Sequence, residues 1–136
     1  MPQHFGHKEL NIVSQSSPTG TQYLQATGAA FALQRDNNKG VVYVSSGEGT
    51  TSQGDFHEAL NWASRVKAPV IFHIENNGYA ISVPIEEQTA GGSVYKISSG
   101  YENLHRLRID GTDYFESLLD RKTFLINRHV QKNSNM

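Results

Sequence analysis

Two short apolar runs, separated by a segment with the repeat of an amphipathic helix, constrain the fold of this chain most strongly. Val41–Ser45 and Val70–Ile74 are nearly continuous apolar runs, which is typical of strands buried on both faces of a sheet. The intervening segment places apolar residues on one helical face: Phe56, Ala59, Leu60, Ala63 and Val66. Strand, helix and strand in that order form a crossover that makes the strands parallel. The pattern predicts an α/β fold, a parallel sheet with flanking helices.

Further elements are expected on both sides of this unit. Residues 21–35 predict a thin helix whose apolar face carries Leu24, Gly28 and Phe31, and Asp55 is expected to cap the helix between the strands. Residues 106–110 predict a third strand, residues 110–113 a turn, and a further helix is expected from Tyr114.

Charge and composition exclude several classes of function. The 136 residues carry 12 basic and 13 acidic side chains, so the net charge of −1 gives no basic surface for nucleic acid. No apolar run is long enough to span a membrane, and the N-terminus lacks the apolar stretch of a secretory signal. With no cysteine, thiolate catalysis and cysteine-ligated metals are excluded. We expect a soluble intracellular protein that binds neither nucleic acid nor membrane.

A carboxylate and an amide follow the two predicted strands. Glu48 lies between Gly47 and Gly49 after the first strand, and Asn76-Asn77 follows the second strand. In open α/β sheets, ligands bind outside the carboxyl ends of the strands. Magnesium prefers oxygen ligands of this kind and commonly arrives with phosphates. The pair predicts a site where magnesium anchors a diphosphate, although each motif taken alone is also a common turn signal.

The two common nucleotide-binding fingerprints do not fit these glycines. A phosphate-binding loop requires a lysine after its last glycine, but Asp55 and Phe56 follow Gly54. A dinucleotide fingerprint requires a glycine three positions after Gly49, where Ser52 stands. Since Glu48 would repel a bare phosphate, a bridging cation is the simpler interpretation.

The longer motifs resemble one enzyme family. Thr51–Asn61 and Asn76–Pro84, together with residues 11–14 and 16–18, resemble the α subunit of 2-oxo acid dehydrogenase E1, which depends on thiamine diphosphate. The similarity covers roughly residues 1–120, which leaves residues 121–136 as a polar tail unlike the family. Glu48 and residues 78–82 favour the branched-chain (2-oxoisovalerate) type, whereas Glu75 is closer to the pyruvate type.

The resemblance implies a set of ligands for the cofactor and its metal. Magnesium is expected at Glu48, Asn77 and the backbone carbonyl of Tyr79. Thiamine diphosphate is expected to contact Ser17, Glu48, Gly49 and Thr50. The resemblance also implies a potassium ion in the loop before the first helix, with oxygen ligands from Ser16, Pro18, Thr21 and Gln22; a capped helix start is the alternative for this loop.

The implied activity is oxidative decarboxylation of a branched-chain 2-oxo acid, with transfer of the acyl group to a lipoyl arm, an oxidoreductase reaction of branched-chain amino acid catabolism. The implied partners are an E1 β subunit or fused β domain and a lipoyl-bearing E2. Family α subunits are longer than this chain, so we expect a fragment that is inactive by itself and carries no catalytic residue. The catalytic histidine loop is expected beyond Met136, and the context of His129 does not match it.

Two other interpretations remain open. A related pyruvate, acetoin or transketolase-type enzyme would share the cofactor site, and a non-catalytic remnant would keep only the fold. Among the histidines, His57 is expected to be a surface or packing residue or to donate to the diphosphate indirectly. His73 is expected in the core, and a zinc pair at His4 and His7 is disfavoured by the intervening glycine.

Overall fold

The computed structural model describes residues 4–119, which divide into two compact units, residues 4–104 and the part of residues 105–136 that ends at 119. The first unit contains every helix and strand that contributes to the predicted site, and each unit is described by itself. The α/β fold predicted from the apolar runs is confirmed, with a small parallel sheet and flanking helices. No helix within residues 4–119 has both the length and the apolar character needed to cross a membrane.

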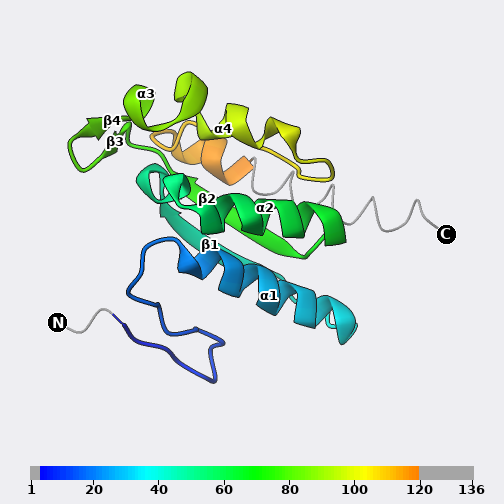
Figure 1. Cartoon of the computed structure of the whole chain (residues 1–136). Helices are drawn as coiled ribbons and strands as arrows, with labels where there is room; N and C mark the ends of the chain where they lie inside the picture. The colour runs from blue at the N-terminus through cyan, green and yellow to red at the C-terminus, as the bar shows by residue number, and fades with distance from the viewer. Residues whose placement is uncertain (1–3, 120–136) are drawn as a thin grey trace. The chain divides into compact units, whose positions relative to one another are not determined.

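The centre of the first unit is a parallel pair of strands, β1 (Val42–Gly47) and β2 (Val70–Glu75). Their register aligns Val42 with Val70 and Gly47 with Glu75, so both strands end at the same edge. Two helices, α1 (Thr21–Arg35) and α2 (Gly54–Val66), pack against each other and cover one face of this pair, as Figure 1 shows. The connection through α2 makes β1 and β2 parallel, as the order of the elements predicts.

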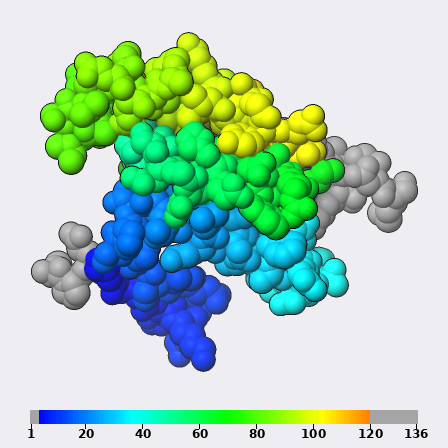
Figure 2. All heavy atoms as spheres, viewed as in Figure 1, coloured from blue at the N-terminus to red at the C-terminus, as the bar shows by residue number. Residues whose placement is uncertain are grey.

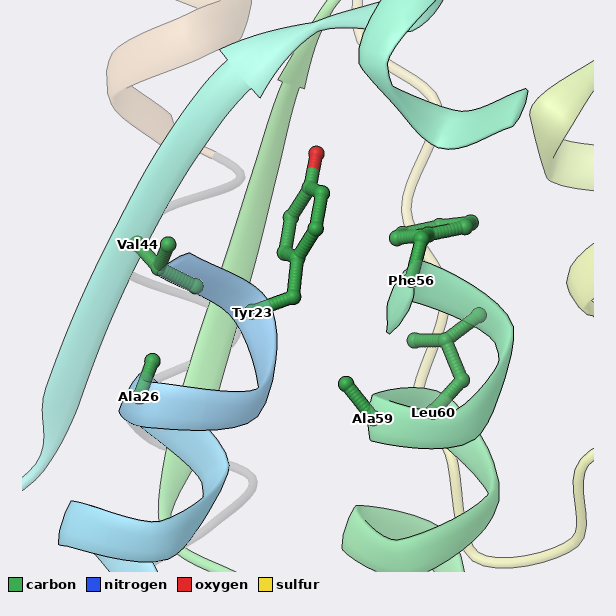
Figure 3. Close-up of a cluster of buried hydrophobic side chains, with 6 residues drawn as sticks. All are labelled: Tyr23, Ala26, Val44, Phe56, Ala59 and Leu60. Carbon is green, nitrogen blue, oxygen red and sulfur yellow. The ribbon is translucent and has the colours of Figure 1, made fainter. Parts of the chain in front are cut away.

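A single aromatic side chain joins the three parts of this core. In Figure 3 the ring of Tyr23, from α1, lies between Val44 of β1 and Phe56 of α2. Its centroid is 4.9 Å from that of Phe56 and 6.0 Å from that of Phe72 on β2. The Tyr23 hydroxyl forms a short hydrogen bond with the hydroxyl of Ser46, at the carboxyl end of β1. Tyr23 therefore fixes α1 to the strand that leads into the candidate site.

The helix at residues 21–35 has the predicted bounds, but the predicted buried face is wrong. Its buried residues are Tyr23, Ala26, Thr27 and Ala30, whereas Leu24 is 37% exposed and Gly28 is also exposed. The helix is turned so that the large ring of Tyr23 is buried and small alanines meet the sheet. The face with Leu24, Gly28 and Phe31 instead lines a hollow of about 290 Å³ with Trp62 and Val66 of α2.

The expectation that both strands are buried on both faces is also wrong. Side chains alternate between a covered and an open face: Val44 is buried, but Tyr43 is 54% exposed and Ser45 is exposed. His73 on β2 is exposed too, and its Nδ1 lies 2.6 Å from the Tyr43 hydroxyl. His73 is thus hydrogen-bonded as expected, but it is not a core residue. The reason is that α1 and α2 cover one face of the strands, and apolar composition alone does not say how many faces are covered.

The helix between the strands carries the predicted apolar face, with Phe56, Ala59, Leu60 and Ala63 buried. Its expected cap is wrong. The helix begins at Gly54, its N-cap residue is Gln53, and no side chain caps it. Asp55 lies instead inside the first turn, where a carboxylate interacts favourably with the positive end of the helix dipole.

Short elements follow each strand. The 3-10 helix η1 (Glu48–Ser52) connects β1 to α2, and in Figure 2 it lies with α2 in the green band above the blue and cyan of α1. After β2, a hairpin of β3 (Tyr79–Ala80) and β4 (Val83–Pro84) leads into α3 (Ile85–Gln88). The remaining short helices of this unit are η2 (Ala90–Gly92), α4 (Val94–Ile97) and η3 (Ser98–Gly100).

The second unit begins without the expected strand. Residues 106–110, where a third strand was predicted, are not in a strand in the part of the chain that the structure describes. The turn at residues 110–113 is confirmed by the bond from the Asp113 amide to the Asp110 carbonyl, 3.0 Å long. Residues 114–119 are helical, and the Asp113 carboxylate caps them by accepting from the amides of Phe115 and Glu116. The expected polar tail and His129 lie outside the described residues.

Tyr23→Phe tests the role of this phenol in the core. Burial raises the pKa of the Tyr23 phenol above its ordinary value, although the hydrogen bond with Ser46 opposes this shift. Removing the hydroxyl leaves Ser46 without this partner, so we expect the free energy of unfolding at neutral pH to fall by about 1 kcal/mol. Urea unfolding followed by circular dichroism measures the change.

The same variant has a predicted pH dependence. Since the folded pKa is raised, the stability contributed by neutral Tyr23 is present below the unfolded pKa of about 10 and is lost as pH rises beyond it. Tyr23→Phe should therefore lose less stability above pH 10 than the unaltered chain. Tyr114→Phe, at a 72% exposed tyrosine, is the control. Equal alkaline losses in all three proteins would contradict the assignment.

Candidate functional site

The ends of β1 and β2 bring the predicted acid and amide together. Because Gly47 is aligned with Glu75, both Glu48 and Asn76-Asn77 leave the sheet at the same edge. The backbone amide of Asn77 donates to Oε2 of Glu48, at 3.3 Å. Residues 29 positions apart in the chain are thereby in direct contact. The structure thus brings the Glu48 carboxylate to the Asn77 backbone, while the Asn77 side-chain oxygen accepts from Tyr79.

Glu48 is the central group of this edge. The residue is only 1% exposed, and its Oε1 atom has no hydrogen-bond partner among the described residues. A buried carboxylate oxygen without a donor is costly, since carboxylates are normally paired or bound to a metal when they leave water. The geometry of Glu48 therefore fits a cation, which would satisfy the remaining oxygen.

The asparagine pair forms two consecutive turns. Asn76 Oδ1 accepts from the amide of Gly78 and Asn77 Oδ1 accepts from the amide of Tyr79, each at 2.9 Å. The turn interpretation of Asn-Asn-Gly thus holds, and it is compatible with a site. These bonds fix the Asn77 side chain in the turn next to Glu48, and an amide oxygen retains a second lone pair for a ligand.

Gly49 is required where the chain approaches the hairpin. A Cβ atom added at Gly49 would lie 2.9 Å from Cβ and 3.2 Å from Cα of Ala80. Only a glycine lets the turn after Glu48 pack this closely on the strand that follows Asn77. Gly49 therefore holds the two halves of the site together through its lack of a side chain.

The loop before α1 packs against η1. Gly20 has a φ of 99°, and a Cβ atom there would meet the Gln53 side chain at 2.8 Å and the Thr50 methyl at 3.9 Å. The loop that carries Ser17 is thus adjacent to Thr50, one of the residues expected to contact the diphosphate. The Ser17 hydroxyl lies 3.3 Å from Nε2 of His4, and Nδ1 of the same ring lies 2.7 Å from the Gln15 carbonyl.

Oxygen atoms of the expected potassium ligands gather in this loop. The Thr21 hydroxyl donates to the Pro18 carbonyl at 3.0 Å and is in short contact with the Ser16 hydroxyl. Gln22 Oε1 accepts from the amide of Gly20 at 2.9 Å. The alternative, a capped helix start, is not observed, because the N-cap residue of α1 is Gly20 and no side chain caps the helix.

The histidines among the described residues do not form a metal site. Within residues 4–119 there is no group of three or more histidine and acidic side chains arranged to hold a metal. His57 lines a pocket of about 190 Å³ beside η1, together with Thr51, Ser52, Gln88, Thr89, Ala90 and Ile97. The predicted magnesium site does not depend on histidine. It needs one carboxylate, one amide oxygen and one backbone carbonyl, and the oxygens of Glu48, Asn77 and Tyr79 suit a hard divalent ion.

Gln88 was not identified from the sequence. Its Nε2 donates to the backbone carbonyl of Glu48 at 3.1 Å, across 40 positions of the chain. Its Oε1 is the second buried oxygen in residues 4–119 without a hydrogen-bond partner. No motif or spacing marks this residue, because its contact with Glu48 depends on how the hairpin and α3 fold back over η1.

Comparison with known proteins shows which family this chain is similar to. The model of the dehydrogenase E1 component family matches residues 1–122. A 2-oxoisovalerate dehydrogenase α subunit of Caenorhabditis elegans, described as mitochondrial, is 45% identical over 136 residues, which cover 96% of this chain and 31% of that protein. The α subunit of Homo sapiens is 45% identical over 115 residues, 85% of this chain and 26% of that protein. The α subunit of Bacillus subtilis is 43% identical over 116 residues, 85% of this chain and 35% of that protein. The chain thus spans about a third or less of these relatives.

Gly49→Ala tests the close approach at the site. The added methyl group must displace Ala80, so we expect the free energy of unfolding to fall by about 1–3 kcal/mol. Gly54→Ala is the matched control, because a Cβ atom there meets nothing within 4 Å and α2 begins at this residue. Chemical denaturation compares the two variants, and equal stabilities would show that the contact between η1 and β3 is loose.

Proposed function

The chain belongs to the dehydrogenase E1 component family, and from this membership we propose that it forms the magnesium- and diphosphate-binding part of a branched-chain 2-oxo acid dehydrogenase E1 α subunit. The observation that carries the proposal is the buried Oε1 of Glu48, next to the turn of Asn77, which has no hydrogen-bond partner within residues 4–119. A magnesium ion between these groups would satisfy that oxygen and neutralise the charge that otherwise repels a diphosphate.

Each group has a distinct role in this proposal. Glu48 supplies a carboxylate oxygen, Asn77 its side-chain oxygen, and Tyr79 its backbone carbonyl to magnesium. Gly49 allows the backbone to approach the diphosphate, and the hydroxyls of Thr50 and Ser17 donate to phosphate oxygens. The contact of Gly20 with Thr50 and Gln53 supports the placement of Ser17 near this end of the cofactor.

A potassium ion in the loop before α1 is part of the same proposal. The Thr21 hydroxyl lies within hydrogen-bond distance of both the Pro18 carbonyl and the Ser16 hydroxyl, and the amide of Gly20 donates to Gln22 Oε1 in the same loop. Potassium bound there would fix the position of Ser17 relative to η1. The ion would thereby order one side of the diphosphate site.

The reaction follows from the cofactor and from chains other than this one. Thiamine diphosphate, when bound, supplies the nucleophilic carbon that allows a 2-oxo acid to lose carbon dioxide. The residues of this chain hold and orient the diphosphate end, and none of them is assigned a proton-transfer role. An E1 β subunit or fused β domain would hold the other end, and a lipoyl-bearing E2 would accept the acyl group. We propose residues 1–120 as the partial cofactor-binding domain and residues 121–136 as a tail outside it.

The names of the relatives favour branched-chain substrates over pyruvate or acetoin. The three relatives reported above are all named as 2-oxoisovalerate dehydrogenase α subunits. They include proteins described as mitochondrial and one from a bacterium, so the proposal places this chain in the mitochondrial matrix or the bacterial cytoplasm. A pyruvate-type enzyme would share the site but prefer the shorter 2-oxo acid.

Ligand-induced stabilisation tests the proposal. A ligand that binds only the folded chain stabilises it by about 2.7 kcal/mol at a hundred times its dissociation constant. We expect millimolar thiamine diphosphate with Mg²⁺ to raise the melting temperature of the 136-residue chain. Glu48→Gln should abolish the rise, because an amide oxygen replaces the carboxylate at the metal. Differential scanning fluorimetry measures both effects.

The control for that experiment is Glu58→Gln, which removes one carboxylate from the exposed side of α2. This variant should keep the full rise in melting temperature. A chain that gains no stability from Mg²⁺ and thiamine diphosphate together would favour the remnant interpretation. A rise that survives in Glu48→Gln would place the ligand elsewhere.

A further inference from the structure

We infer that Gln88 is a positioning residue of the cation site, holding the backbone at Glu48 so that its carboxylate stays directed toward the turn of Asn77. The inference rests on the proposed function, since it concerns the same cation. Gln88 touches neither reacting atoms nor a proposed ligand oxygen of the metal. Its role is to hold Glu48, which is the proposed ligand of the metal.

The hydrogen bonds at the Glu48 carbonyl support this role. Nε2 of Gln88 donates to that carbonyl at 3.1 Å, and the hydroxyl of Thr51 donates to it at 2.6 Å. A carbonyl oxygen has two lone pairs, so both are used. The peptide of Glu48 is held from two sides, which leaves only its side chain free to bind an ion.

Gln88 also closes a ring of contacts around the site. The amide of Asn77 donates to Glu48 Oε2, and the amide of Ile85 donates to the carbonyl of Gly78 at 2.9 Å. Ile85 begins α3, is 6% exposed, and is thereby tied to the asparagine turn, while Gln88 ends α3 and returns to Glu48. The hairpin that connects the asparagine turn to α3 packs on Gly49 through Ala80. The ring therefore connects the two halves of the metal site at a second point, independent of the sheet.

The unsatisfied side-chain oxygen of Gln88 argues against a purely structural role for this residue. Oε1 of Gln88 is buried without a partner in the part of the chain that the structure describes, and it lies 3.8 Å from the Cβ position of Gly49. A buried acceptor without a donor opposes stability, so this side chain gains one hydrogen bond and loses another on folding. Replacing it with an apolar group of similar length should leave the stability of the ligand-free chain nearly unchanged. Cation affinity, in contrast, should fall.

Gln88→Met tests this separation of stability from affinity. Methionine keeps the length of the side chain and removes both the donor and the unsatisfied acceptor. Residues that support metal ligands typically change metal affinity by about 10–100-fold when they are replaced. We expect Gln88→Met to weaken Mg²⁺ binding by about tenfold or more in calorimetric titrations of the 136-residue chain with thiamine diphosphate present. The melting temperature without ligand should stay close to that of the unaltered chain.

The matched control is Gln34→Met. Nε2 of Gln34 donates to the carbonyl of Val66 at 3.0 Å, a bond of the same type that joins the ends of α1 and α2, away from the strand ends that carry the site. This variant should leave the Mg²⁺ affinity unchanged. Equal affinities in the Gln88 and Gln34 variants would overturn the inference. So would a loss of affinity in Gln88→Met that merely accompanies a lowered melting temperature, because that result is expected of a structural residue.

If the unaltered chain binds no Mg²⁺, a measurement without ligand tests whether Gln88 holds Glu48 in position. That result would count against the proposed function and not against the positioning role. In this case, hydrogen exchange of the Asn77 amide reports on its bond to Glu48 Oε2. Gln88→Met should accelerate the exchange and shift the Asn77 amide resonance, whereas Gln34→Met should do neither. An unchanged Asn77 amide in both variants would show that Gln88 does not hold Glu48.

Discussion

The parallel ladder between β1 and β2 is the interaction on which the rest of the structure depends. It aligns Gly47 with Glu75, and this single register determines that Glu48 and Asn77 meet. A shift of one residue would direct alternate side chains to opposite faces and separate the two groups. Tyr23 supports the register from α1, because it packs on Phe56 and Phe72 and bonds to Ser46 near the end of β1. The core and the candidate site are thus adjacent parts of one arrangement.

The site itself is less favourable to stability than the core that supports it. The structure buries Glu48 Oε1 and Gln88 Oε1 without donors in the described part of the chain, and each such group opposes folding by about 1–3 kcal/mol. Nearby, Ile81 at the tip of the hairpin adopts a φ of 58°, a conformation that is strained for a β-branched residue. Unsatisfied groups and strained backbone of this kind cluster where a ligand completes the structure. The unsatisfied Oε1 belongs to the same Glu48 carboxylate that accepts from the Asn77 amide, which agrees with the proposed cation at this contact.

The sequence predicted those parts of the molecule whose geometry follows from the order of strands and helices along the chain. Two strands and a connecting helix place their carboxyl ends together whatever the details of packing, so Glu48 and Asn77 could be paired from spacing alone. The observed bounds of α1 match the helix predicted at residues 21–35, with Gly20 just before it and Asp36 just after it. The buried face of α1 could not be predicted in this way. Tyr23 and Leu24 are neighbours of similar apolar character, and only the presence of Ser46 and Phe56 in space decides which of them turns inward.

The contact between Gln88 and Glu48 could not be predicted from the sequence. It arises where the chain reverses direction, and no repeat of apolar residues predicts such a reversal. This contact requires the asparagine turns, the hairpin and α3 to be formed first, each with its own short-range bonds. All of these contacts lie within residues 4–104, as do the ladder and the loop around Ser17. The geometry of the candidate site is therefore set inside one compact unit. The open face of the strands at Tyr43 and His73, and the hollow lined by Leu24 and Trp62, contribute nothing to that geometry. The arrangement of Glu48, Asn77 and Gln88 is consequently formed within this unit, while large apolar side chains elsewhere in it remain exposed.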